Sequence, residues 1–289
     1  MRSPGLVADA PAPVRPDASR TSRLRRLRRL LCIVGLPVLI CACASRPPAA
    51  AVSELAPLGR LRAAINLGNP ILASKDSLTG EPRGVAVDLS RELAKRLGVP
   101  LELVTFTSAG RVLGAVKAAQ VSLAFVGYEP QRSADMNYTA PYVVIEGAYL
   151  VRKSSAIKSN AQVDRPGVRV AVGAGSACDL FLARDLKAAS LVRAPSSPEV
   201  TDFFVSRQLD VAAGVKQQME TDSRRVAGLR LLDGRFMVIN QAVSIPKGRE
   251  AGARYLREFI EEMKASGFVA RALQRHGIEG AAVAPAASS

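Results

Sequence analysis

The sequence is poor in aromatic residues, histidine and cysteine. Phe, Trp and Tyr together make up 4% of the 289 residues, and tryptophan is absent. Proteins that bind nucleic acids usually combine clustered Arg and Lys with aromatic side chains on which bases stack. Here the basic residues beyond the N-terminal region are spread along the chain, so we expect no nucleic-acid partner.

The scarcity of cysteine and histidine limits the metal and disulfide chemistry of the chain. Cys32, Cys41 and Cys43 fall in an N-terminal leader, which leaves Cys178 alone in the remaining sequence. One thiol cannot form an intrachain disulfide, and the single histidine, His276, adds too little for a metal site. We therefore expect no metal and no cofactor.

What is present is a strong excess of positive charge. The chain has 40 Lys and Arg against 25 Asp and Glu. The first 43 residues hold eight Arg and two Asp, so removing them leaves 32 basic against 23 acidic residues, or +9. The run RLRRLRRL is followed by an apolar stretch that is shorter than the ~20 residues of a membrane span. A cationic front, a short apolar run and small residues are typical of a signal peptide, which we place at residues 1–43.

The end of this leader, Ile40 to Cys43, resembles a bacterial lipoprotein processing box. The resemblance implies that Cys43 is lipidated and becomes the new N-terminus, because Ala42 before it is small. An ordinary secretory signal cleaved near Ala44, or an uncleaved anchor, are the alternatives. In every case the rest of the chain is exported, and we expect a periplasmic protein that a lipid holds to a bacterial membrane.

Composition divides the exported part into a tether, a folded region and a tail. Residues 44–58 are rich in Pro, Ala and Ser and predict a flexible tether. Residues 279–289 lack any pattern and predict a disordered tail. The region between them begins near Gly59 and is long enough for one large domain or two lobes with their own cores.

Hydrophobic periodicity predicts strands that alternate with helices through the folded region. In residues 85–98, Leu89, Leu93 and Leu97 recur at four-residue spacing, which gives a helix one apolar face. Repeats of strand, helix and strand imply an α/β fold with mainly parallel pairing. Further strands are predicted at 60–68, 100–106, 121–127, 168–173, 190–194, 209–214 and 229–233. Further helices are predicted at 110–119, 176–188, 197–207, 216–226 and in two segments after residue 248.

Two long apolar runs interrupt this alternation. Residues 141–153 and 235–248 each read as extended chain without a turn. Two α/β units joined by two uninterrupted extended segments predict two lobes with a two-strand hinge. We expect a ligand-binding cleft between the lobes.

These residues carry a resemblance to a known family. The chain is similar to the bacterial extracellular solute-binding proteins of family 3, the polar amino-acid receptors of ABC importers. The matching blocks include GRLRAAINLGNP, EPRGVAVDLSRELAKRLGVPLELV, EPQRSADMNYTAPYVVIEGAYLV, GVRVAVGAGSACDLFL, QLDVAAGV and YLREFIEEMKASGFVARAL. The resemblance implies a type II periplasmic binding protein fold, with two mixed sheets flanked by helices. It also implies one lobe from 59–147 and 241–278, a second from 148–240, a monomeric state and a membrane permease as partner.

The glycine turn before residue 177 is the first candidate binding element. In the family, the corresponding turn gives backbone N–H groups to a ligand carboxylate, and Gly175, Ser176 and Ala177 occupy those places. The first amides of a helix lack internal partners, so an anion binds there favourably. A nucleotide site would need a third Gly or Ala where Cys178 stands. A turn with no ligand role is the remaining alternative.

Arg132 is the second candidate. It follows strand 121–127 at the place where the family keeps the arginine that grips the ligand carboxylate. A guanidinium can form two parallel hydrogen bonds to a carboxylate, which Lys cannot reproduce. A surface arginine that caps a short helix is the structural alternative.

The chain departs from the family where a ligand ammonium group would bind. By alignment, the usual acidic residue there corresponds to Val215, and Lys216 follows it. A cleft with two basic side chains and no carboxylate suits an anion that lacks an ammonium group. Glu146 or Asp179 could supply the missing negative charge.

Five further positions are candidate ligand contacts by the same alignment. Phe125 and Gly127 replace a serine pair, although Phe125 is also a natural core residue. Asn66 replaces a frequent Asp and Asn69 an aromatic lid, while both also suit a turn. Lys216 could contact a ligand or be a solvated charge.

Three functions follow as hypotheses. The first is a receptor that closes on a small carboxylate-bearing ligand, an amino acid or a related organic acid, and delivers it to an ABC importer. The second is a periplasmic enzyme that resembles the cyclohexadienyl dehydratases, for which Glu146 or Lys216 would be the general acid. The third is a sensor that binds a ligand and signals to a partner.

Overall fold

The computed structural model describes residues 46–287. The predicted signal peptide and its lipidation site Cys43 lie outside these residues. Within residues 46–287, no helix combines the length and the apolar character that a membrane crossing requires.

Two groups of parallel strands form the two ends of one curled, mixed sheet, in the order β4-β1-β5-β12-β7-β10-β8-β9. The first group consists of β1 (Leu61–Asn66), β4 (Leu101–Phe106) and β5 (Leu123–Gly127). The second consists of β8 (Arg169–Gly173), β9 (Ser190–Ala194) and β10 (Val211–Val215). Strand-helix-strand connections produce the parallel pairing that the sequence predicts.

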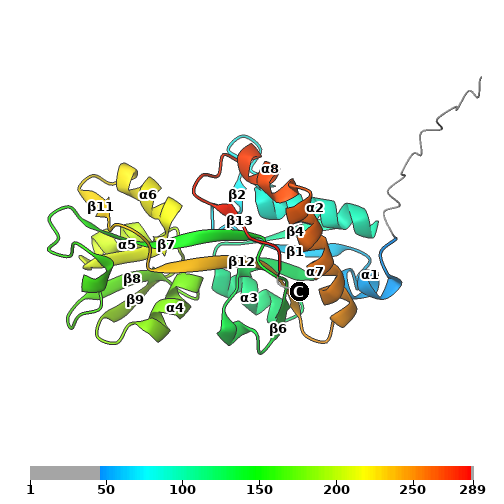
Figure 1. Ribbon diagram of the computed structural model, residues 1–289, viewed down its shortest axis with the longest axis horizontal. Coiled ribbons are helices and arrows are strands. Elements are labelled where there is room, and N and C mark those ends of the chain that lie inside the picture. The colour runs from blue at the N-terminus through cyan, green and yellow to red at the C-terminus, as the bar shows by residue number, and fades with distance from the viewer. Residues whose placement is uncertain (1–45, 288–289) are drawn as a thin grey trace, which may run out of the picture. The chain divides into compact units, whose positions relative to one another are not determined.

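Two long antiparallel strands connect the groups. They are β7 (Val143–Arg152) and β12 (Met237–Pro246), which pair with each other from Met237 opposite Gly147 to Gln241 opposite Val143. β12 also pairs with β5, and β7 pairs with β10, so both strands run from one group into the other (Figure 1). The two predicted extended segments are therefore the crossing strands. We call the elements around β1, β4 and β5 the first half, and those around β8, β9 and β10 the second half.

Helices cover the faces of both strand groups. In the first half these are α2 (Val85–Leu97), α3 (Ala109–Lys117), α7 (Glu250–Ala265) and α8 (Phe268–Arg275). In the second half they are α4 (Ala177–Asp185), α5 (Val200–Ser206) and α6 (Lys216–Arg225). Helix α2 buries Leu89, Leu93 and Leu97 on one face and ends at Gly98, whose left-handed backbone satisfies the last carbonyls.

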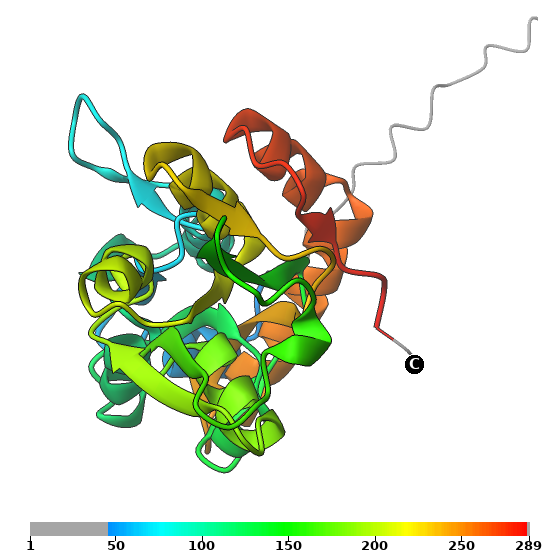
Figure 2. The same ribbon diagram turned by 90° about the vertical axis from the view of Figure 1, so that its left-hand side faces the viewer.

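Three short strands extend the sheet, and a hairpin stands apart from it. β6 (Met136–Tyr138) pairs with β12, and β11 (Leu229–Leu231) and β13 (Ala282–Val283) pair with β7. β2 (Ser74–Lys75) and β3 (Pro82–Arg83) form a separate two-stranded hairpin that projects from the first half (Figure 2). Neither β6 nor this hairpin is predictable from periodicity, because each strand is too short to show a period.

The prediction of a flexible tether is wrong over most of the described part of residues 44–58. Residues 49–55 form a helix, α1, which packs on α7. Leu55 is fully buried, and the Glu54 carboxylate accepts a hydrogen bond from the Gly252 amide at 2.7 Å. The helix forms because one apolar edge, Ala51 and Leu55, meets a partner that composition alone does not reveal.

The prediction of a disordered tail is also wrong over residues 279–287. Ala282 and Val283 pair with β7, and Ala284 is buried, with its amide donating to the Tyr142 carbonyl at 3.1 Å. The Lys264 ammonium group donates to the Pro285 carbonyl at 2.8 Å. Backbone pairing with Val143 and Val144 of β7 orders this segment although its side chains are small.

Candidate functional site

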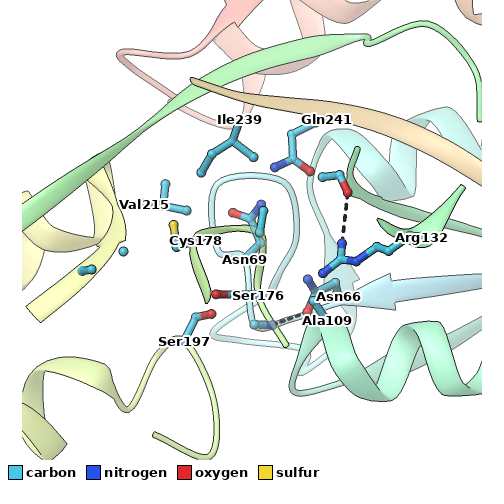
Figure 3. A pocket seen from close by; sticks show the side chains of 15 residues that line it. Asn66, Asn69, Ala109, Arg132, Ser176, Cys178, Ser197, Val215, Ile239 and Gln241 are labelled. Carbon is cyan, nitrogen blue, oxygen red and sulfur yellow. Dashed lines mark hydrogen bonds between the residues drawn. The ribbon is translucent and has the colours of Figure 1, made fainter. Parts of the chain in front are cut away.

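A cavity lies where the two halves face each other, at the carboxyl ends of β1, β5, β8 and β10 (Figure 3). Ligands in open α/β folds bind in this position, because parallel strands bring the loops that follow them to one edge. Six of the predicted contact residues line it: Asn66, Asn69, Gly127, Arg132, Ser176 and Ala177. The lining also includes Gly68, Ala109, Cys178, Ser197, Ala213, Gly214, Val215, Ile239 and Gln241.

The two halves approach closely around this cavity, whose volume is about 40 Å³. That is room for about two or three water molecules. A Cβ atom added at Gly175 would lie 3.2 Å from the Cα atom of Gly110 in the first half. A Cβ added at Gly127 would lie 3.1 Å from that of Ala177. Glycine at these positions permits backbone contact between the halves, and a ligand larger than a few waters requires the halves to separate.

Arg132 bridges the halves. It ends a short 3-10 helix (Pro130–Arg132) after β5 and is 6% exposed. Its Nη1 donates to the Gly127 carbonyl at 3.0 Å, and its Nη2 donates to the Gly175 carbonyl of the second half at 2.7 Å. Its Nε is buried without a hydrogen-bond partner among residues 46–287.

The charge of this guanidinium has no ion-pair partner in the described part of the chain. Burial lowers the pKa of Arg132, while Tyr138, Glu129 and Asp179 act in the opposite direction through space. Arginine nevertheless remains protonated in proteins. A buried cation that faces only carbonyl oxygens is costly unless an anion joins it, and such groups concentrate at functional sites.

The family resemblance predicts that Gly175 offers its amide to a ligand carboxylate, but in the structure this amide has another partner. The Gly175 amide donates to the Asp179 carboxylate at 2.9 Å, so it is not directed at the cavity, and Gly175 is not among the lining residues. Asp179 is 4% exposed and also accepts from Nε of Arg193 at 3.0 Å. Its position in the first turn of α4 places its negative charge at the positive end of the helix.

Ser176 and Ala177 do line the cavity. The Ser176 side chain caps α4 by accepting from the Asp179 amide at 3.1 Å, as a serine at a helix start commonly does. The Ser176 amide donates to the Gly173 carbonyl at 3.1 Å. Ala177 is the first residue of α4, where backbone amides lack partners within the helix.

Asn66 and Asn69 serve both the turn and the cavity. The Asn66 carboxamide oxygen accepts from the Gly68 amide at 3.0 Å, and the Asn69 amide donates to the Asn66 carbonyl at 3.2 Å. Asn69 is 8% exposed, and its Oδ1 has no partner among residues 46–287. The two predicted roles therefore coexist, and Figure 3 shows Asn69 at the centre of the lining residues.

Two predicted contacts lie elsewhere. Phe125 is 3% exposed and packs edge-on against Tyr142, with ring centroids 5.9 Å apart. Its side chain belongs to the core because both faces of β5 are covered. Lys216 pairs with Glu146 at 2.9 Å, and neither residue lines the cavity.

Glu146 is held by two basic side chains. Its second partner is Arg235, at 2.6 Å. The hydrogen bonds from Lys216 and then Arg235 lower the pKa of the Glu146 carboxyl below its ordinary value. This acid is therefore ionised and engaged in an ion-pair cluster beside the crossing strands.

A second polar contact joins the halves next to Arg132. Glu129, 3% exposed on the first half, pairs with Arg184 of α4 at 3.3 Å. The sequence does not predict this pair, because residues 55 positions apart give no local signal. Ser197 after β9 and Gln241 on β12 are likewise not predicted, because they reach the cavity only through the sheet order.

Two α/β halves, two crossing strands and a cavity between them define the class of two-lobed binding proteins with the type II periplasmic fold. Residues 61–279 match the bacterial extracellular solute-binding proteins, family 3. The chain belongs to this family.

Three solved structures of similar fold are described as binding proteins or as a binding component of a transporter. A putative binding component of an ABC transporter from Wolinella succinogenes, complexed with lysine, is 24% identical, with a TM-score of 0.65 over 75% of this chain and 95% of its own. An amino acid ABC transporter substrate-binding protein from Streptococcus pneumoniae, bound to L-arginine, is 19% identical, with a TM-score of 0.67 and coverages of 78% and 97%.

The ancestral amino acid-binding protein AncCDT-1, a precursor of cyclohexadienyl dehydratase, is 22% identical, with a TM-score of 0.66 and coverages of 78% and 99%. At these identities the likeness establishes the fold and leaves the ligand to the residues of the cavity. None of the curated proteins compared matches the chain.

Proposed function

We propose that this protein is an extracytoplasmic solute-binding receptor of an ABC importer and that it closes on a small ligand carrying a carboxylate. The observation that carries the proposal is the buried Arg132 guanidinium, which lines the cavity without an ion pair among the described residues. A carboxylate gives this cation a partner of matching geometry and removes the cost of its isolation.

Closure follows from the placement of the contacts. Arg132 and Gly127 belong to the first half, whereas Ser176 and Ala177 belong to the second. A ligand that touches both sides stabilises the closed arrangement by contacts that an open one lacks. In this proposal residues 59–147 with 241–278 move as one lobe and residues 148–240 as the other.

Transport is the context that the relatives suggest. Two of the three similar structures reported above are components of ABC transporters, one with lysine and one with L-arginine bound. We extend this to a permease partner for the present chain and to a lipid anchor on Cys43, which would keep the receptor near that permease.

The proposal includes no catalytic step. A general acid must lie within hydrogen-bond reach of the group that it protonates. Glu146 and Lys216, the candidates for a dehydratase, pair with each other and lie outside the cavity lining.

A ligand panel tests the proposal. Residues 44–289 would be screened by thermal shift and calorimetry with small amino, oxo, hydroxy and dicarboxylic acids, together with an Arg132→Ala variant. We expect at least one acid to raise the melting temperature of the wild type in a concentration-dependent way and to lose this effect in the variant. An acid that binds both forms equally would contradict the role of Arg132, and turnover of a cyclohexadienyl acid would favour the enzyme.

A further inference from the structure

The lining of the cavity carries a positive charge and no negative one. Arg132 is the one charged residue of this lining, and no Asp or Glu of residues 46–287 is part of it. A 2-amino acid is a zwitterion, so its ammonium group also needs a partner once water is removed. Burying a charged group without an opposite charge or a full set of hydrogen bonds is unfavourable.

Two buried acids close in sequence to lining residues are paired with arginines. Asp179 accepts from Arg193 and from the Gly175 amide, both at about 3 Å. Glu129 pairs with Arg184 of the opposite half at 3.3 Å. A ligand ammonium group could therefore reach either carboxylate only by displacing the arginine that already holds it.

The third nearby acid is engaged as well. Glu146 is bound by Lys216 at 2.9 Å and by Arg235 at 2.6 Å. Its two oxygens therefore each face a basic side chain, and a ligand ammonium group would have to replace one of them. Asp179, Glu129 and Glu146 are thus each engaged by a basic side chain, and no Asp or Glu of residues 46–287 lines the cavity.

The part of the cavity supplied by β10 is apolar. Ala213, Gly214 and Val215 end this strand and line the cavity, and Ile239 of β12 lines it too. The polar groups nearby are neutral. They include the Asn69 carboxamide, buried with an unpartnered Oδ1, and the side chains of Ser197 and Gln241.

We propose that the cavity selects small carboxylates whose neighbouring carbon carries an uncharged oxygen, as a hydroxyl or keto group, over the corresponding 2-amino acids. This inference rests on the proposed function, since it assumes that Arg132 holds the carboxylate. A carboxamide such as that of Asn69 offers one acceptor and two donors. It can therefore accept from a hydroxyl or donate to a keto oxygen without any charge being buried.

Matched ligands test the inference on the wild-type chain, residues 44–289. Each set has one carbon skeleton and differs only at the second carbon: lactate, pyruvate and alanine; 2-hydroxyglutarate, 2-oxoglutarate and glutamate; 2-hydroxyisocaproate, 2-oxoisocaproate and leucine. We expect the best-bound set to favour the hydroxy or oxo acid by about tenfold or more over the amino acid, in calorimetry at neutral pH. Tighter binding of the amino acid overturns the inference but leaves a carboxylate receptor intact.

A charge introduced at Val215 tests the cause. Val215 is the N-cap of α6, has extended backbone (φ −63°, ψ 130°) and makes no capping hydrogen bond. Asp and Asn both suit this position, so Val215→Asp and Val215→Asn differ mainly in charge. We expect the Asp variant to bind the amino acid about tenfold more tightly than the Asn variant does, and the oxo acid less tightly.

The outcomes separate the two proposals. Equal amino-acid affinity in the Asp and Asn variants would show that the missing acid does not set the preference, and it would overturn the inference. Failure of every set to bind the wild type would instead reject the carboxylate receptor for these ligands, and the inference with it. Should the Asp variant not fold, the wild-type comparison decides alone.

Discussion

The two walls of the cavity recognise a ligand in different ways. The first half contributes Asn66, Asn69 and Arg132, whose polar side chains enter the cavity. The second half contributes mainly small residues, such as Ala177 and Gly214, together with backbone at the start of α4. The charge and the carboxamides therefore come from one wall, and shape, backbone dipoles and two serine hydroxyls from the other. Substitutions on the first wall should remove recognition, whereas those on the second should act through closure.

Loss of the guanidinium should have the largest effect. Arg132→Ala removes the one charged group of the lining, and a charged hydrogen bond contributes about 1.5–3 kcal/mol. We expect a loss of about 3 kcal/mol in ligand binding, or on the order of 100-fold in affinity, measured by calorimetry.

Two controls sharpen this test. Arg132→Lys keeps the charge but not the planar fork, and it should recover part of the lost affinity. Arg254 is exposed on α7, so Arg254→Ala should bind like the wild type. A similar loss in the Arg254 variant would mean that net charge, rather than the first wall, governs affinity.

A side chain on the glycine turn should have the next largest effect. Gly175 has a left-handed backbone (φ +67°) and lies against Gly110, so Gly175→Ala adds strain and obstructs the approach of the halves. Gly167→Ala is a matched control, because Gly167 is also left-handed (φ +83°) but a Cβ there meets nothing within 4 Å. Both variants should lose about 1 kcal/mol of unfolding free energy.

Only Gly175→Ala should also weaken ligand binding, by several-fold, and enlarge the radius of gyration of the ligand-saturated protein in solution scattering. Identical affinities in the two variants would show that the close approach at Gly110 is not needed for binding.

The ion pair between the halves should contribute less. Glu129→Gln removes the carboxylate that meets Arg184, whose side chain is 45% exposed and therefore partly screened by solvent. We expect a loss of at most about 1 kcal/mol in ligand affinity, which shrinks at high salt. Asp135→Asn, which breaks a pair with Lys117 inside the first half, should leave affinity unchanged. A salt-independent loss would point to packing instead.

The smallest effect should be the loss of stability at low pH that Glu146 causes. The pKa of Glu146 is lowered by Lys216 and Arg235, so its folded pKa lies below the unfolded value of 4.5. Its stabilisation is therefore present above that pH and is lost as the pH falls through the folded pKa. Because Arg235 is 55% exposed, we expect less than about 1 kcal/mol. Urea unfolding of Glu146→Gln should show a weaker loss of stability below about pH 4.5 than the wild type, and equal acid sensitivity would contradict this assignment.

Periodicity predicts most of the fold because most elements carry their own pattern. The helix over residues 85–97 and the crossing strands appear where the apolar spacing places them. Helix α1 and strand β13 do not, since they are ordered by partners far along the chain: α1 by α7, and β13 by β7. An Ala-rich segment is compatible with a tether or a packed helix, and only the partner decides.

The site is predictable to the extent that strand ends mark it. Arg132 and Asn69 each follow a strand closely, which brings them to the cavity. Phe125 could not be placed in this way, because every residue of β5 is buried and a fully apolar strand does not reveal which face looks toward a ligand. The use of the Gly175 amide by Asp179 depends on a side-chain rotamer and on Arg193 of a neighbouring strand.

The hydrogen bond from Arg132 to the Gly175 carbonyl has a consequence for how affinity is set. That peptide oxygen competes with any incoming carboxylate for the same nitrogen, as a tethered rival present at high local concentration. Capture is then an exchange, so the measured dissociation constant equals the intrinsic one divided by the fraction of molecules in which the rival is not bound. A change in the position of the Gly175 carbonyl would therefore alter ligand affinity without any change in the residues that line the cavity.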